Sequence, residues 1–138
     1  MKRVLIPTPL ILVGLMLAGC APSAPSTETY VMSLGNVQDS TNVLDVPGSV
    51  KAGDALKIRV SVGFGGCEEF NKFESKRTND TLELKPIGLR QLNVACTAIY
   101  SAKWVDFVDA GLPRTNPFKV IVRSGNGADL ERPVTVNP

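Results

Sequence analysis

The sequence predicts an all-β fold, a single antiparallel β-sandwich of about seven strands, from three observations. Apolar and polar residues alternate with period two in several short stretches. Turn signals that contain glycine, proline or asparagine separate these stretches. No stretch after residue 40 carries a convincing amphipathic helix. These features together favour one sandwich of roughly 100 residues.

The first half of the predicted sandwich holds two strands. A short one at residues 43–46 is closed by the Pro47-Gly48 turn. The clearest one covers residues 56–64, in which every second residue is apolar: Leu56, Ile58, Val60, Val62 and Phe64. This alternation predicts one face on the core and the other in water. The glycines at positions 63, 65 and 66 predict a sharp corner after it.

The middle of the chain is ambiguous. Residues 68–76 fit either a short helical turn or an irregular strand, because Cys67, Phe70 and Phe73 recur every three residues. The alternating residues 82–85 predict a short strand that ends before Pro86.

Three later segments complete the sandwich. Residues 94–100 are apolar and partly β-branched, which predicts a central strand. Residues 118–123 alternate again and predict another strand, followed by a turn at 124–127. Val134 and Val136 predict a last strand. The whole pattern resembles immunoglobulin-like and fibronectin-type modules in general, without matching a particular named family.

Composition excludes several kinds of chemistry. The chain has no histidine, so Ser-His-Asp and Cys-His catalysis are excluded and the commonest transition-metal ligand is missing. The formal net charge is +2, and two of the basic residues are Lys2 and Arg3. The remaining charges balance and are scattered, so no nucleic-acid partner is expected. No catalytic residue, metal site or cofactor is predicted.

The N-terminal residues have the pattern of an export signal. Lys2 and Arg3 precede an apolar run over residues 4–18, which is short for a membrane span. A short transmembrane anchor is the alternative. The run ends in Leu17-Ala18-Gly19-Cys20, which resembles the lipobox of bacterial lipoproteins.

The lipobox resemblance implies a location. It implies cleavage before Cys20, a diacylglycerol thioether on its sulfur, and acylation of the new amine, with palmitate as the expected chain. The predicted division is a signal peptide at 1–19, the lipidated cysteine and a flexible tether at 20–40, and the sandwich at 41–138. The protein would be anchored in the cell envelope, facing away from the cytoplasm. Ala21 implies the outer membrane if the cell has two.

Assigning Cys20 to lipid leaves an even pair, Cys67 and Cys96. An exported chain meets oxidising conditions, so the sequence predicts a structural disulfide between them. A redox site would favour Cys-x-x-Cys spacing, and a zinc site would need further ligands.

Two groups of residues are candidates for a site. The carboxylates of Glu68, Glu69, Asp106 and Asp109 could serve calcium binding or glycoside acid–base chemistry, although solvated surface charge is the simpler interpretation. Four aromatic residues could form a binding patch, although core packing is the simpler interpretation: Phe70, Phe73, Tyr100 and Trp104.

The predicted function is that of a lipid-anchored, non-catalytic binding or accessory module. Expected partners are the membrane, through the N-terminal lipid, and another envelope protein or a glycan. The alternatives are a structural subunit of an envelope complex and a small carboxylate-dependent hydrolase.

Overall fold

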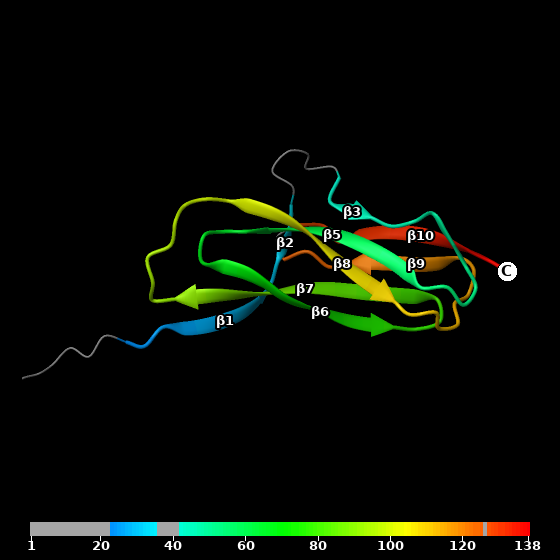
Figure 1. The fold of residues 1–138 in the computed structure, drawn as a ribbon, viewed down its shortest axis with the longest axis horizontal. Helices are drawn as coiled ribbons and strands as arrows, with labels where there is room; N and C mark the ends of the chain where they lie inside the picture. Colours follow the sequence, from blue (N-terminus) through cyan, green and yellow to red (C-terminus); the bar gives the residue numbers. More distant parts are fainter. Residues whose placement is uncertain (1–22, 36–41, 126) are drawn as a thin grey trace, which may run out of the picture.

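The computed structural model describes residues 23–35, 42–125 and 127–138, which form two packed β-sheets (Figure 1). One sheet contains six strands, namely β1 (Ser26–Val31), β4 (Ser49–Lys51), β6 (Glu68–Arg77), β7 (Thr81–Leu92), β9 (Phe118–Val122) and β10 (Leu130–Asn137). The other contains four, namely β2 (Ser33–Leu34), β3 (Leu44–Asp45), β5 (Leu56–Phe64) and β8 (Ser101–Asp109). The all-β, sandwich-like fold predicted from the sequence is confirmed.

The two longest inner strands, β5 and β7, organise the sheets. β5 pairs with β8 on one edge and with β2 and β3 on the other. β7 pairs with β6 on one edge, and its other edge is shared between β1 and β9. The β9 strand continues the sheet to β10 and β4.

The sandwich is mixed rather than purely antiparallel, which corrects the predicted pairing. β7 pairs with β9 in parallel, and β10 pairs with β4 in parallel. The parallel pairing of β7 with β9 follows from the path of the chain between them. The chain leaves β7, crosses to the other sheet as β8, and then returns to the first sheet as β9. The described residues also form ten strands, several only two or three residues long, rather than about seven.

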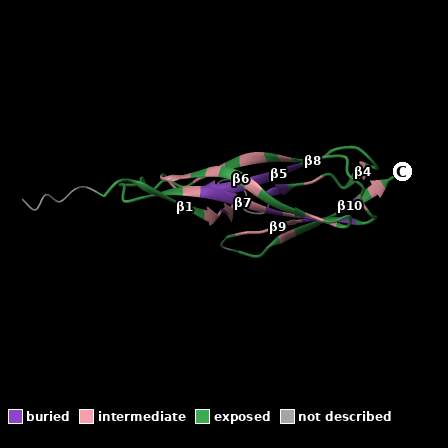
Figure 2. Cartoon of the chain, turned by 90° about the horizontal axis from the view of Figure 1, so that it is seen from below, coloured by how far each residue is buried: buried purple, intermediate pink, exposed green. Residues whose placement is uncertain are grey.

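The hydrophobic core lies between β5 and the facing strands β7, β9 and β10. Figure 2 shows buried residues concentrated in the middle of these strands. The inward residues are almost inaccessible to solvent: Leu56, Ile58, Val60, Val62, Leu82, Leu84, Phe118, Val120, Val122 and Val134. The predicted alternation over residues 56–64 and 118–122 is therefore confirmed, because the apolar set of each strand faces one core.

The ambiguous residues 68–76 belong to strand β6, and a β-bulge explains their three-residue period. Phe70 pairs with Gly88 and Phe73 pairs with Pro86, while the register shifts between Phe70 and Lys72. One extra residue in the strand turns both phenylalanines toward the same side of the sheet. Both rings pack against the core, with their centroids 5.0 Å apart.

Strand β7 continues through Pro86, where the sequence predicts an end. Pro86 lies where the partner of β7 changes from β9, paired up to Leu84, to β1, paired from Ile87. Its carbonyl accepts a hydrogen bond from the Met32 N–H at 2.8 Å. The missing N–H of proline therefore falls in the gap between two partner strands, where the ladder needs no donor.

Two predicted boundaries are wrong. Residues 95–100 have no strand structure, and residues 91–100 are all exposed, so the predicted central strand at 94–100 is a loop. The strands also begin before residue 41. The residues of β1 are rich in threonine, tyrosine and valine, which favour strands, and β1 completes the edge of β7. Residues 26–34 of the predicted tether thus belong to the folded domain.

Candidate functional site

A disulfide closes the corner at which β5 turns into β6. The Cys67–Cys96 bond joins the start of β6 to the loop after β7, with the Cα atoms 5.3 Å apart. The predicted pairing of these two cysteines is confirmed. The bond ties residues 93–100, which make no strand pairs, to the glycine corner at residues 65–66.

A polar cluster supports the same corner. The Gly65 N–H donates to Glu68 Oε2 at 2.7 Å, and Arg90 Nε donates to Glu68 Oε1 at 2.7 Å. The Arg90 guanidinium also lies 4.6 Å from the centre of the Tyr30 ring. Glu68 therefore connects the corner to β7, and Arg90 connects β7 to β1.

This cluster shifts the pKa values of Glu68 and Tyr30, among others. Burial opposes ionisation of Glu68, but hydrogen bonds from the Gly65 N–H and Arg90 outweigh it and hold the pKa of Glu68 below its usual value. Burial and the neighbouring Glu68 carboxylate raise the pKa of Tyr30 to about 12. The Tyr30 hydroxyl is buried without a partner in good hydrogen-bonding geometry. Glu68 is thus held as a structural anion.

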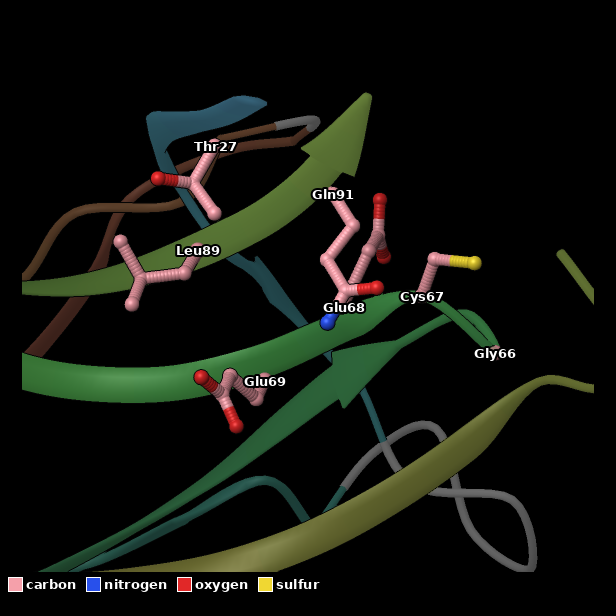
Figure 3. Close-up of a pocket in the computed structure, with 7 residues that line it drawn as sticks. All are labelled: Thr27, Gly66, Cys67, Glu68, Glu69, Leu89 and Gln91. Atoms are coloured by element: carbon pink, nitrogen blue, oxygen red, sulfur yellow. The ribbon is translucent and has the colours of Figure 1, made fainter. Parts of the chain in front are cut away.

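A shallow hollow of about 170 Å³ lies beside the disulfide (Figure 3). Its lining comes from β1, the glycine corner, β6 and β7: Thr27, Gly66, Cys67, Glu68, Glu69, Leu89 and Gln91. Small-molecule pockets usually enclose about 300–1,000 Å³ and are mostly apolar. This hollow is smaller and partly polar, so it does not have the form of a small-molecule site.

The four predicted aromatic residues do not form one patch. Phe70 and Phe73 pack against the core through β6, and Phe73 also meets Phe107 with centroids 5.6 Å apart. Tyr100 and Trp104 lie instead on the outer face of β5. Burial of the two phenylalanines is the consequence of the bulge in β6.

Tyr100 and Trp104 occupy neighbouring positions on that outer face. Trp104 pairs across the strands with Ser61, and the Arg59 guanidinium lies 5.1 Å from the centre of its ring. The Tyr100 hydroxyl lies so close to Gly63 that a Cβ there would be 1.8 Å from it. Gly63 is therefore required by close approach of a side chain, while half of Tyr100 stays exposed.

The four predicted carboxylates do not converge. Glu68 binds Arg90, whereas Asp106 lies 2.9 Å from Lys57 Nζ. Asp109 pairs with Leu56, at the end of β5 far from Phe64 and the glycine corner. Eight residues of strand separate those ends by about 26 Å. Asp109 is thus far from Glu68 and Glu69, which line one hollow. The described residues contain no cluster of metal-ligating side chains.

Asp109 belongs to a buried ion cluster that the sequence analysis does not identify. Arg77 Nε donates to Asp109 Oδ1 at 2.8 Å, and Arg114 Nη2 donates to Oδ2 at 2.6 Å. Both guanidinium groups lie 5.5 Å from the centre of the Phe118 ring. The Arg114 side chain is 1% exposed. The cluster fixes the loop after β8 to the core, which is a structural role.

Residues 92–100, here named the apolar tip, were also missed as a surface. Four of its side chains are large, apolar or aromatic, and exposed: Leu92 (36%), Val94 (39%), Ile99 (63%) and Tyr100 (52%). The only signal in the sequence is their apolar character, which equally suits a buried strand. Composition therefore does not reveal that these residues form an exposed loop, and only their lack of strand pairing in the structure shows it.

The fold and the disulfide corner define a small, disulfide-bonded β-sandwich. A comparison with protein-family models, with curated proteins and with solved structures finds no match. Among the residues that the structure describes, no helix is long and apolar enough to cross a membrane.

Proposed function

We propose that this chain is a lipid-anchored protein of the cell envelope whose sandwich serves as a non-catalytic binding or accessory module. The supporting observation is the use of its three cysteines. The lipobox-like residues around Cys20 account for one, and the other two are joined as Cys67–Cys96. Disulfides persist in oxidising compartments outside the cytoplasm, which agrees with export.

The form of the domain supports a binding role. Glu68, Asp106 and Asp109 are each held in a separate ion pair, and the hollow that Glu68 and Glu69 line beside the disulfide is small. Four of the six large apolar or aromatic side chains that are exposed among the described residues lie on one loop, the apolar tip. Such surfaces on soluble domains mark contact with a partner or a membrane.

A structural subunit is the second candidate, and an open sheet edge favours it. Within the described residues, the nine-residue strand β8 pairs with β5 alone. An unpaired edge of this length can accept a strand from another protein.

The lipid anchor is tested by a Cys20→Ser variant in the native cell. The variant should accumulate as an unprocessed precursor and incorporate no labelled fatty acid, because serine offers no thiol for the thioether. The Cys67→Ser/Cys96→Ser variant is the matched control and should still be processed and labelled. Continued processing and detergent partitioning of the Cys20→Ser variant would contradict the anchor. Crosslinking in intact cells would then separate fixed subunits from transient partners.

A further inference from the structure

The apolar tip belongs to an uncharged run of sequence, residues 91–102. The ion pair of Glu68 and Arg90 lies beside this run, at the disulfide corner. The tip itself exposes four large apolar or aromatic side chains, and such groups of exposed apolar side chains mark contact surfaces.

The chain enters the fold beside the apolar tip. Ser26, the first residue of β1, pairs with Leu92, the last residue of β7. Figure 1 shows β1 entering at the end where the loop from β7 to β8 lies, with the C-terminus at the opposite end. An anchor attached to the chain before Ser26 would therefore lie on the side of the domain that carries the apolar tip.

The length of chain before Ser26 limits the distance to that anchor. Only residues 21–25 separate Cys20 from Ser26. Six steps of fully extended chain span at most about 20 Å. A lipid on Cys20 would therefore keep Ser26, and with it Leu92 at the base of the apolar tip, within that distance of the bilayer surface. So short a connection makes even a weak contact effectively intramolecular.

We propose that the apolar tip rests in the interfacial layer of the same membrane that holds Cys20, an inference that depends on the lipidation proposed above. Leu92, Val94 and Ile99 supply apolar side chains to the boundary between head groups and acyl chains. The half-exposed Tyr100 ring packs over Gly63 and adjoins these side chains. No charged group within the tip opposes the transfer.

The disulfide makes this contact possible. Cys96 lies between Val94 and Ile99 and is bonded to the framework at Cys67. The bond restricts the loop and reduces the conformational entropy lost on contact.

The membrane contact would orient the sandwich with its C-terminus away from the bilayer. The open edge of β8 would then run along the outward direction, accessible to a partner.

The test uses single tryptophans in the lipidated mature protein. In a Trp104→Phe background, Ile99→Trp reports on the apolar tip and Leu112→Trp is the matched control at the opposite end. Both replaced side chains are at least half exposed. Each variant is reconstituted in phosphatidylcholine–phosphatidylglycerol vesicles with and without brominated acyl chains. Mass spectrometry first verifies the lipid on Cys20, and circular dichroism verifies folding.

The proposal predicts loss of emission in brominated vesicles for Ile99→Trp alone. Equal emission of Ile99→Trp in both kinds of vesicle would overturn the proposal, as would equal quenching of both variants. Shielding of Ile99→Trp from aqueous iodide without quenching by bromine would also overturn it, because a protein would then cover the tip. A protein without lipid on Cys20 would refute the proposed function itself, before any vesicle is made.

Discussion

At the scale of single residues, one buried charge cluster makes a single substitution costly. Asp109 is 5% exposed and is shared by Arg77 and Arg114 at one end of the core. Arginine has no accessible neutral form, so loss of the carboxylate leaves positive charge beside apolar residues.

We predict that Asp109→Ala lowers the free energy of unfolding by about 3–5 kcal/mol, the usual cost of removing one partner from a buried ion pair. Urea unfolding followed by circular dichroism measures the change. Asp106→Ala is the control, because Asp106 makes its ion pairs on the surface, and it should change stability little. Similar effects of the two substitutions would show that the cluster has no special role.

Tyr30 gives a prediction with a defined pH window. Its folded-state pKa is raised to about 12 from a usual value of 10, first by burial and then by the Glu68 carboxylate. A raised pKa contributes stability that is complete below pH 10 and is lost as pH rises toward 12. Above pH 10, therefore, stability should fall by at most about 1.4 kcal/mol per pH unit through this group.

Tyr30→Phe should abolish that part of the alkaline loss. At neutral pH the variant should be about as stable as the wild type, because the buried hydroxyl makes no hydrogen bond in good geometry and its removal costs little. The difference between the two unfolding curves, taken from pH 7 to pH 12, isolates this residue from the titrating lysines. A constant difference across that range would refute the assigned pKa.

At the scale of elements, the disulfide is the main constraint on the apolar tip. Cys67 and Cys96 close a loop with a sequence separation of 29. The Cys67→Ser/Cys96→Ser variant should lose roughly 3–4 kcal/mol of unfolding free energy, because its unfolded chain is less restricted. It should also be cut by protease within residues 93–100 before global unfolding. Reductant should reproduce both effects in the wild type and leave the variant unchanged.

The strands that could be predicted from sequence are those with one buried face. β5 and β9 alternate strictly, and each was correctly located, because a slip of one residue would expose its whole apolar set. β6 could not be predicted, since its bulge replaces the period of two by an interval of three between Phe70 and Phe73. β7 was shortened in the prediction because Pro86 usually ends a strand, and the change of partner there is a tertiary feature.

Of the candidate site, only the disulfide could be predicted from the sequence. The Cys67–Cys96 pairing follows from counting cysteines once Cys20 is set aside. The four aromatic residues could not be sorted from the sequence, because composition does not distinguish Phe70, packed against the core, from Tyr100 at the surface. Residues 94–100 suit a buried strand and an exposed apolar loop equally well, and only strand pairing decides between them.

At the scale of the whole molecule, the two ends of the sandwich differ. Its uncharged apolar tip lies beside the entry of the chain, and the C-terminus lies at the opposite end (Figure 1). This arrangement agrees with anchoring through the N-terminus, because the uncharged loop would face the bilayer. The central claim is therefore that Cys20 carries the anchor.

Mass spectrometry of the protein extracted from its native membranes decides whether Cys20 is the anchor. We expect a chain of 119 residues that begins at Cys20, after removal of 19 of the 138 residues. The N-terminal peptide should carry a diacylglyceryl group on the cysteine sulfur. A chain that still begins at Met1, or an N-terminal peptide with an unmodified Cys20, would contradict the account.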